Sequence, residues 1–344
     1  MNLKTDAWNL NPNDYYNACT PEERIKHILR YGLLSPSTHN TQPWRFKINA
    51  TSCELYSDPE VKLYMADPDG RNLYISMGCL IETIIVAAKY FNVYDNVIYN
   101  THSNNPVARI NFKNLLRNQK CNNALEPLMN AIVQRSTYRG VFTGVFLSKH
   151  QKEMISNAST INNVQVSLYN DSGSKAQITK LTSEAVEFIA NDKKFRHELS
   201  EWMISNYSNR KDGIPGYSYG FSNVASIIAP WLMRLLNPSR IMAKKTYSTF
   251  SSAASLIIIS TIEDKKIDWV NAGRVSQLVM LLLTSEKIRF SISVAAIQSK
   301  EHFAKLRSLL NTNAYPQFIL AAGSAEYNRK LTPRYDLKNK LYYL

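Results

Sequence analysis

A short loop, residues 36–44, carries side chains suited to holding a ligand. Its sequence is Pro-Ser-Thr-His-Asn-Thr-Gln-Pro-Trp, and it separates an amphipathic segment from an apolar alternation at residues 44–48. The two prolines exclude helix here, and the tryptophan is large enough to anchor the turn against a core. The side chains of Ser37, Thr38 and Asn40 either face a polar ligand or satisfy one another in an Asx or Ser turn. We interpret Gln42 and Trp44 as structural.

Three arginines form a second candidate group. Arg135 and Arg139 flank Thr137 in an Arg-x-Thr-x-Arg spacing, and Arg334 lies near the C-terminus. A guanidinium is permanently charged and donates two parallel hydrogen bonds, which suits a phosphate. Any one of these arginines alone is better explained as a surface ion-pair partner. The spacing, taken together with the 36–44 loop, favours a phosphate site.

Metal chemistry has no support in the sequence. The four cysteines are widely separated, form no CxxC pair and are better explained as buried or idle thiols. The six histidines are scattered, with no HExxH and no other ligand spacing. We therefore expect no metal.

The charge balance of the 344 residues is strongly basic, with a formal net charge of +14. Basic clusters such as residues 193–196 are too sparse for a nucleic-acid tail, and no nucleic-acid motif is present. The excess is either a field that attracts anionic ligands or an incidental surface bias. The apolar runs, 84–88 and 278–283, are far shorter than the roughly 20 residues of a membrane span. We expect a cytoplasmic protein with neither a nucleic-acid nor a membrane partner, since residues 1–6 hold no apolar signal core.

Apolar periodicity and turn chemistry predict a mixture of helices and strands. Residues 1–19 are expected to be a polar, surface-draped lead-in, and a helix start at Thr20-Pro21 follows. The predicted helices are 21 to about 32–35, 71–90, 125–134, 148–155, 175–191, 195–203 and 268–286. The predicted strands are 45–49, 53–56, 96–100, 108–112, 164–169, 254–261, 290–295 and 317–321. Helices 71–90 and 268–286 are apolar on nearly every face, so both should lie in the middle of the fold.

Residues 205–247 interrupt this pattern. Turn chemistry at 212–216 is followed by an apolar and aromatic stretch, which predicts a lid over a ligand rather than a framework element. Its aromatic side chains either stack on the ligand or plug the pocket. They are Tyr217, Tyr219, Phe221 and Trp231.

The chain also shows an internal duplication. Helix 77–89 has a counterpart at 272–285, each with a glycine near its start, and residues 36–40 are echoed by 158–162. The second copy of the loop lacks the prolines, the Gln and the Trp. The basic 135–139 segment has no counterpart upstream, because residues 9–17 carry no cation. The pattern predicts one complete ligand site per chain, assembled across the two halves.

The motifs resemble those of the nitroreductase superfamily of FMN-binding flavoproteins. The 36–44 loop resembles its P-S-x-x-N-x-Q-P-W segment almost residue for residue, residues 135–139 resemble its R-R-S-x-R segment, and 332–334 resemble its basic C-terminal site. Shared features at 69–71, 213–215 and 268–273 are most similar to the Acg-like branch. The resemblance covers about residues 20–336 and implies a nitroreductase-like α+β fold that fuses two ancestral subunits. Its two intertwined halves, 20–115 and 124–344, would have mainly antiparallel sheets around long central helices, with the lid inserted at about 205–247.

The resemblance also implies where FMN binds. Ser37, Thr38 and Asn40 would hydrogen-bond the ribityl chain or ring edge. Arg135, Ser136, Thr137, Arg139 and Arg334 would hold the phosphate. A backbone N–H at about Ala295 to Gln298, with Ala296 and Ile297 as the chosen positions, would face the flavin N5. We expect no catalytic side chain, because the flavin performs the redox chemistry.

The predicted function is NAD(P)H-dependent reduction of a small nitroaromatic or quinone-type acceptor by an FMN oxidoreductase. The alternative is a flavin-storing or flavin-sequestering protein, whose occluded FMN turns over little. The expected assembly is a monomer that contains an internal pseudo-dimer.

Overall fold

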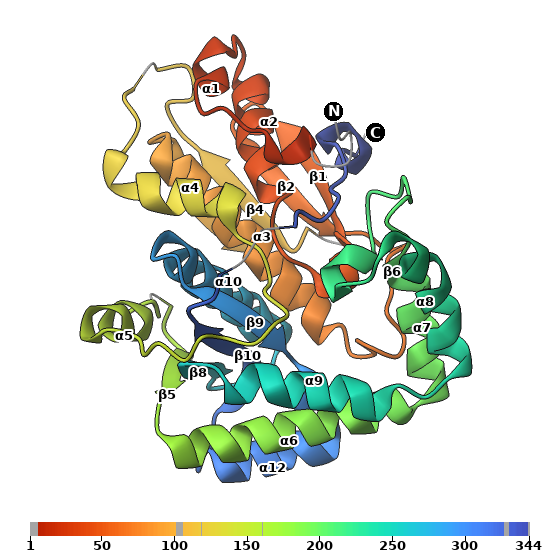
Figure 1. Ribbon diagram of the computed structural model, residues 1–344. Helices are drawn as coiled ribbons and strands as arrows, with labels where there is room; N and C mark the ends of the chain where they lie inside the picture. The colour runs from red at the N-terminus through yellow and green to blue at the C-terminus, as the bar shows by residue number, and fades with distance from the viewer. Residues whose placement is uncertain (1–5, 101–105, 118, 160, 327–329, 343–344) are drawn as a thin grey trace.

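The computed structural model describes residues 6–100, 106–117, 119–159, 161–326 and 330–342. Two four-stranded antiparallel sheets and two long helices between them form its framework (Figure 1). Strands β1 (Trp44–Asn49), β2 (Ser52–Ser57), β3 (Tyr94–Tyr99) and β4 (Ala108–Phe112) make the first sheet, in the order β1-β2-β4-β3. The α+β class is confirmed, and each of these strands lies within two residues of its predicted position.

The second sheet repeats the first. It contains β5 (Val164–Tyr169), β8 (Ser255–Thr261), β9 (Arg289–Ser293) and β10 (Tyr315–Gly323), in the order β5-β8-β10-β9. In both sheets the first two strands pair, a long helix follows, and the last two strands add in reversed order. The repeated order supports the duplication that the sequence suggested.

Helices α3 (Arg71–Tyr90) and α10 (Lys266–Ser285) cross at a pair of glycines. A Cβ at Gly78 would lie 2.0 Å from the carbonyl oxygen of Val270, and a Cβ at Gly273 would lie 2.1 Å from that of Ile75. Each glycine thus faces the residue three positions before the other glycine, as in a self-complementary two-fold contact. The two backbones can approach this closely only because neither position carries a side chain.

The hydrophobic cores of the two sheets share these helices. Ile75 and Cys79 of α3 pack in the cluster of the second sheet, whereas Val270 and Leu281 of α10 pack in the cluster of the first. Helix α4 (Glu126–Gln134), preceded by the 3-10 turn η3 (Asn123–Leu125), also packs in the first cluster through Met129. The two sheets are therefore joined through a continuous interior.

The N-terminal segment differs from the prediction. The structure places a 3-10 turn η1 (Asp6–Trp8) and a short helix α1 (Asp14–Asn17) here, and it buries Trp8 and Tyr15 in the core. Tyr15 stacks on Phe91 with ring centroids 4.1 Å apart. Residues 6–19 are thus packed rather than surface-draped, and the first five residues lie outside the described part of the chain. Helix α2 (Pro21–Gly32) follows with the predicted start, since Thr20 and Glu23 form a capping box.

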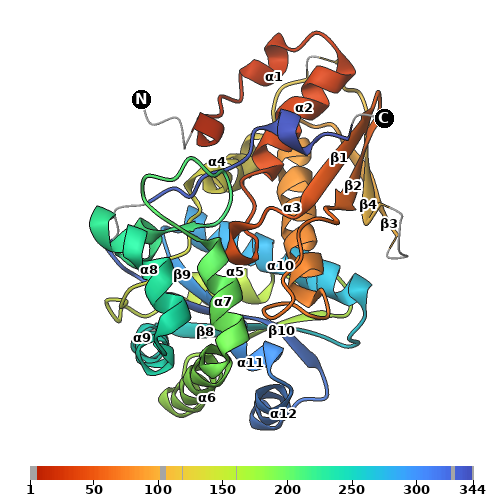
Figure 2. The ribbon, with the colours of Figure 1, turned by 90° about the vertical axis from the view of Figure 1, so that its right-hand side faces the viewer.

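The insertion between β5 and β8 is larger than predicted. It contains α6 (Ser172–Asn191), α7 (Lys193–Trp202), α8 (Asn223–Leu235) and α9 (Ser239–Ser251), with β6 (Met203–Ile204), β7 (Ile214–Pro215) and η4 (Gly216–Tyr219) between α7 and α8. The corresponding strands of the first sheet, β1 and β2, are joined by two residues. Figure 2 shows α6 and α9 below the second sheet and α7 and α8 rising beside it. The predicted lid, 205–247, is therefore only the second part of an insertion that begins near residue 170.

Four further elements complete the described chain: α5 (Lys149–Ser156), α11 (Ala295–Gln298), α12 (Lys300–Leu309) and η5 (Leu337–Lys340). Among the described residues, α3 is long and apolar enough to cross a membrane, but 83% of its apolar stretch is buried inside the molecule, as in a core helix. The described residues contain no group of three or more His, Cys, Asp or Glu that could hold a metal ion.

Candidate functional site

The loop between α2 and β1 has an unusual backbone. His39, Asn40 and Gln42 have positive φ values of 52°, 58° and 51°, and the 3-10 turn η2 (Thr38–Asn40) lies within the loop. Left-handed backbone at a residue other than glycine costs about 1 kcal/mol or more and persists only where surrounding contacts impose it. The loop is therefore held in one strained shape.

Distant segments supply those contacts. The Asn40 side chain donates to the carbonyls of Gly213 and Pro333, both at 3.0 Å, and accepts from Arg334. Gln42 donates to Lys211 O at 2.7 Å and accepts from the Tyr335 amide at 3.0 Å. Trp44 is fully buried. The structural roles predicted for Gln42 and Trp44 are confirmed, whereas Asn40 ties three segments together instead of presenting its amide to a ligand.

Two adjoining cavities open beside this loop. The larger, about 410 Å³, lies between the loop, α3, the end of β9 and helix α9, and the smaller, about 80 Å³, lies between the loop, residues 135–139 and residues 330–334. They share six lining residues, including Ser37, Thr137 and Arg139. The larger volume falls in the roughly 300–1,000 Å³ range of cofactor pockets. The first half of the chain therefore supplies the loop, and the second half supplies the basic segments.

Positive charge dominates the lining of both cavities. Arg135, Arg139, Lys330 and Arg334 line the smaller cavity, Lys245 lines the larger, and no Asp or Glu lines either among the described residues. Burial and the charge of Arg135 lower the pKa of Arg334 to about 9. Burial and the charge of Arg139 also lower the pKa of Lys245. Cations gathered in this way, with no carboxylate lining the space between them, have the chemistry that suits an anion.

Arg334 and Arg139, both predicted to hold a phosphate, make different contacts in the structure. Arg334 already donates to Asn40, to Thr332 Oγ1 at 2.6 Å and to the carbonyls of Leu34 and Ser35, and its guanidinium stacks 5.0 Å from the Trp8 ring centroid. Only its Nε is buried without a partner. Arg139 has no carboxylate partner among the described residues. Arg139 is thus the more available donor, and Arg334 mainly holds the loop while adding charge.

Most predicted site residues are brought together at these cavities. The hydroxyl residues Ser37 and Thr137 line both, Thr38 lines the larger, and Ser136 lines the smaller with its Oγ buried and without a partner. Ser37 Oγ accepts from the Gln42 amide at 2.9 Å, which leaves its own proton available. Ala296 and Ile297 do not line the cavities, because α11 turns both side chains into the core beneath the second sheet. Their neighbours Ala295 and Gln298 line the larger cavity instead.

The lid prediction holds for one aromatic residue of four. Tyr219 lines the larger cavity, with the Arg139 guanidinium 5.8 Å from its ring centroid and Lys245 Nζ donating to its carbonyl at 3.3 Å. Tyr217 instead donates its hydroxyl to Leu331 O at 2.7 Å. Phe221 lies outside the cavity lining, and Trp231 is 63% exposed. The insertion therefore closes over the cavity through η4 and α9 rather than through α8.

Sequence reasoning missed His39 and Lys245. His39 lines both cavities, its Nε2 is buried without a partner, and burial and the charge of Arg139 lower its pKa to about 4. Its imidazole is therefore neutral at neutral pH. The position of His39 inside the loop motif could have marked it as a candidate site residue, but the sequence does not indicate whether its side chain faces the cavity. Lys245 lies in an ordinary amphipathic helix and gave no signal at all.

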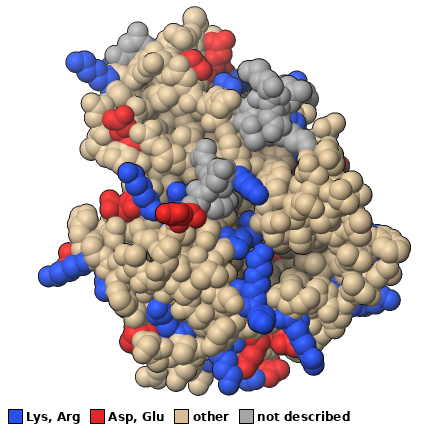
Figure 3. Space-filling model, in the orientation of Figure 1, with Lys and Arg blue, Asp and Glu red and all other residues tan. Residues whose placement is uncertain are grey.

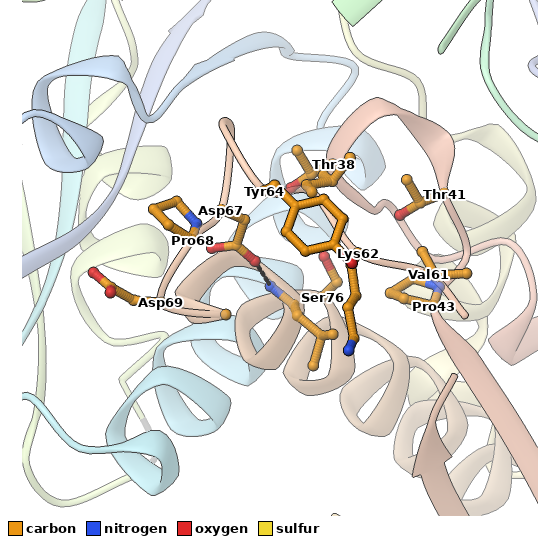
Figure 4. A pocket seen from close by; sticks show the side chains of 13 residues that line it. Thr38, Thr41, Pro43, Val61, Lys62, Tyr64, Asp67, Pro68, Asp69 and Ser76 are labelled. Carbon is orange, nitrogen blue, oxygen red and sulfur yellow. Dashed lines mark hydrogen bonds between the residues drawn. The ribbon is translucent and has the colours of Figure 1, made fainter. Parts of the chain in front are cut away.

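A third cavity, of about 360 Å³, adjoins the larger one through Thr38 and Ser76 (Figure 4). Its wall includes Leu63, Leu73 and the ring of Tyr64, which is 72% exposed. Asp67 on its rim accepts from the amides of Asn72 and Leu73, both at 2.8 Å, and burial raises its pKa to about 6. This cavity offers an apolar, aromatic space next to the cofactor-sized one.

Known proteins provide a further comparison for this site. No family model matches the chain. The Mycobacterium tuberculosis protein named "Putative NAD(P)H nitroreductase Rv3131" is 24% identical over 328 residues, which cover 92% of this chain and 90% of that protein. The likeness extends over nearly the whole of both chains. The chain belongs to the nitroreductase superfamily.

Within this superfamily it is related to the Acg-like proteins. The M. tuberculosis protein named "Putative NAD(P)H nitroreductase acg" is 30% identical over 83 residues, 24% of this chain. Among solved structures, the FMN and NADPH-dependent nitroreductase NfnB from Sphigopyxis sp. strain HMH has a TM-score of 0.42 and 18% identity, and covers 63% of this chain and 98% of its own. The nitroreductase with bound FMN from Desulfitobacterium hafniense has a TM-score of 0.38 and 12% identity, with 63% and 98% covered.

Proposed function

We propose that this nitroreductase-superfamily protein binds one FMN in the two adjoining cavities and uses NAD(P)H to reduce a small acceptor of the nitroaromatic or quinone type. The observation that carries the proposal is the carboxylate-free, cation-rich lining, contributed jointly by the 36–44 loop and the later basic segments. The names of the relatives, which specify NAD(P)H nitroreductases, supply the class of reaction.

The donor set fits a flavin mononucleotide. The smaller cavity offers an anion site in which Arg139, Ser136 and Thr137 would hold the phosphate, with Ser37 beside them. The larger cavity has apolar walls that include Ile75, Val294 and Phe318, together with hydroxyl side chains such as Ser291 and Ser293. An aromatic ring system with a few hydrogen-bonding edges suits such a wall. FMN combines both chemistries in one molecule.

The protein's own contribution is position and electrostatics. FMN, when bound, supplies the redox chemistry between NAD(P)H and the acceptor. Thr38, Ser291 and Ser293 would orient the ring edges, and the strained loop, fixed by Asn40, would hold Ser37 and Thr38 in place before binding. Because the loop is already organised, little conformational entropy would be lost when FMN binds.

The cavity of Figure 4 is the proposed acceptor site. It adjoins the larger cavity through Thr38 and Ser76, so a small ring placed there would lie next to the flavin. Tyr64 and Leu63 offer ring and methyl contacts to such an acceptor. The charged groups on this lining are Lys62, which could pair with a nitro or quinone oxygen, and Asp67 and Asp69, which oppose its charge.

A second candidate function, flavin sequestration, rests on the contacts that close the insertion. The Lys245–Tyr219 hydrogen bond joins η4 to α9, and the Arg139–Tyr219 contact joins η4 to the 135–139 segment, so together they form a latch over the larger cavity. A latch that stayed shut around FMN would prevent reduction by pyridine nucleotides.

An absorption spectrum separates these functions. The purified chain, reconstituted with FMN and freed of excess, should be yellow, bleach under anaerobic NADPH or NADH, and regain its colour when a quinone is added. Bound flavin that neither nucleotide reduces, while dithionite does, would establish sequestration instead. Protein that retains no FMN after reconstitution would contradict both. We further propose a cytoplasmic monomer whose two halves, 20–115 and 124–344, form the internal pseudo-dimer.

A further inference from the structure

Helix α8 presents its largest apolar side chains to solvent. Six of them are between 41% and 68% exposed, and they recur at helical spacing, so that they form one continuous stripe. We call this stripe the α8 patch. Its members are Val224, Ile227, Ile228, Trp231, Leu232 and Leu235.

The opposite face of α8 is the one that packs on the protein, and it is small. Ser226 is buried, and Ala229, Pro230 and Met233 are partly buried. An ordinary surface helix buries its large apolar side chains and exposes its small or polar ones. Contiguous apolar exposure of this size marks an interaction surface.

Charge near the patch has one sign. Residues 213–262 contain no Asp or Glu, and they include four cations: Arg234, Arg240, Lys244 and Lys245. Lys245 faces the larger cavity, while Arg234, Arg240 and Lys244 are exposed. Figure 3 shows the lobe that contains α8 as a broad area without charged side chains, with Lys and Arg along its lower edge.

The acids on the neighbouring helices are largely engaged. Glu187 lies 3.6 Å from Arg240, and Glu201 lies 3.5 Å from His197. Asp192 caps α7 by accepting from the Lys194 amide at 2.7 Å. These contacts do not remove the carboxylate charges, and the Glu187 pair offsets Arg240. Residues 172–262 as a whole nevertheless contain eleven Lys or Arg and six Asp or Glu, so the surface around the patch is apolar with a net basic border.

The apolar stripe and its basic border together indicate which kind of partner this surface would bind. A contact between two copies would bring two net-positive insertions together, which disfavours such a dimer. A bilayer with anionic lipids instead accepts the apolar stripe among its acyl chains and attracts the bordering cations. Helix α8 has 13 residues, about 20 Å at 1.5 Å per residue, so it is too short to span the roughly 30 Å hydrocarbon core.

We infer that the α8 patch docks this protein peripherally on an anionic lipid bilayer, with α8 lying in the interface and Trp231 inserted. The inference does not depend on the proposed reaction. It revises the expectation of no membrane partner, which considered only segments long enough to span a bilayer.

Trp231 provides a direct readout. All five tryptophans lie within the described residues, and Trp231 alone is exposed, whereas Trp8, Trp44 and Trp269 are buried and Trp202 is partly buried. The full chain is mixed with vesicles of phosphatidylcholine alone or of phosphatidylcholine and phosphatidylglycerol. We expect flotation with the anionic vesicles, a blue shift of tryptophan emission and loss of quenching by aqueous acrylamide, all weakened by high salt.

Paired variants test each component of the surface. Trp231→Ser with Leu235→Ser should reduce flotation by about tenfold or more, as should Arg240→Glu with Lys244→Glu. Phe146→Ser with Lys149→Glu, at exposed positions outside the insertion, should leave flotation unchanged. Circular dichroism and FMN content confirm that each variant is folded.

Two results would overturn the inference. One is equal behaviour of the wild-type chain with anionic and neutral vesicles at low salt, or no flotation with either. The other is a lipid-free dimer in sedimentation that the Trp231 and Leu235 substitutions convert to monomer, because the patch would then be covered by a second copy.

Discussion

Arg139, His39 and Asn40 lie within one small region but do different work. Asn40 uses both hydrogens of its side-chain amide on the carbonyls of Gly213 and Pro333 and accepts from Arg334, so it fixes the loop. Arg139 lines both cavities and has no described carboxylate partner, and His39 lies beside it with a buried, unpartnered Nε2. The ligand-facing charge therefore resides on Arg139 more than on any other single residue.

Replacing Arg139 with Ala should weaken FMN binding by about 100-fold, the equivalent of a charge-assisted pair worth about 3 kcal/mol. The measurement is fluorescence quenching of FMN titrated with apoprotein. Arg240→Ala, at a side chain that is 92% exposed on α9, is the matched control and should bind as the wild type does. An Arg139→Ala protein that retains FMN at wild-type affinity would remove the phosphate assignment.

His39 should make the apoprotein less stable in acid. Its pKa is lowered to about 4 in the folded state from an ordinary 6.5, because it is buried next to Arg139. Between these values the unfolded chain binds a proton that the folded chain does not, so stability falls as the pH drops from 6.5 toward 4, by up to about 3 kcal/mol.

The matched variant is His39→Asn, since Asn tolerates the positive φ at this position. It should flatten the dependence of urea unfolding on pH in that window, relative to the wild type. His27, whose pKa is also lowered to about 4, remains in both proteins, so the difference reports on His39. Parallel curves for the two proteins between pH 4 and 6.5 would refute the assignment.

Tyr64 tests the acceptor site separately from the cofactor site. Tyr64→Ala should raise KM for a quinone by about tenfold, the equivalent of 1.4 kcal/mol of aromatic contact, while FMN content and the rate of reduction by NADPH stay unchanged. Tyr207→Ala, at a ring that is 63% exposed and outside the three cavities, should have no effect. An unchanged KM in Tyr64→Ala would place acceptor binding elsewhere.

Most residues that the sequence singled out lie together in the structure, but some make contacts that the sequence did not suggest. Ser37, Thr38, Ser136, Thr137 and the arginines meet as the motif spacing suggested. The tying role of Asn40 could not be predicted, because its partners are carbonyls more than 170 positions away in the chain. Backbone carbonyls leave no signature in a sequence, so only the fold reveals them.

At the scale of elements, the crossing of α3 and α10 is the main contact between the two halves of the framework. Gly78 and Gly273 let the two helix backbones touch, and Ile75 and Val270 of each helix pack in the core of the opposite half. Gln277 Nε2 donates to Thr83 Oγ1 across the same crossing at 2.9 Å. The crossing is therefore tight and specific.

Gly78→Ala should destabilise the protein by about 3 kcal/mol or more, because the new Cβ would lie 2.0 Å from a backbone carbonyl that cannot move aside. Gly173→Ala, in the first turn of α6 with its nearest contact at 3.5 Å, is the control and should be neutral or slightly stabilising. The midpoint of urea unfolding compares them. Equal midpoints would show that the helices do not pack closely.

Element prediction succeeded where periodicity was strong. The 71–90 helix and the 164–169 strand have the predicted bounds, because each has a clear pattern bordered by turn residues. Helix α12 was missed, since its polar sequence buries only His302 and Leu306. The insertion was underestimated because α6 and α7 look like framework helices until the pairing of β5 with β8 shows that both interrupt a hairpin.

At the scale of the whole molecule, two topologically equivalent sheets share one interior, yet their ligand-binding parts differ. The first half contributes the strained loop, and the second contributes the basic segments and the insertion that covers the cavities. The net charge of +14 is consistent with attraction of anionic cofactors. Residues 213–262 contain no Asp or Glu, so part of this positive charge lies in the insertion that covers the larger cavity. The duplication thus has a symmetric framework and an asymmetric site.

The most direct test of this account is the number of flavins bound per chain. Apoprotein titrated with FMN in a calorimeter should bind one equivalent and should be a monomer in sedimentation. The Arg139→Ala protein should bind FMN about 100-fold more weakly. Two equivalents per chain, or one per two chains, would contradict a single site between the fused halves. No binding by folded wild-type protein would contradict the account altogether.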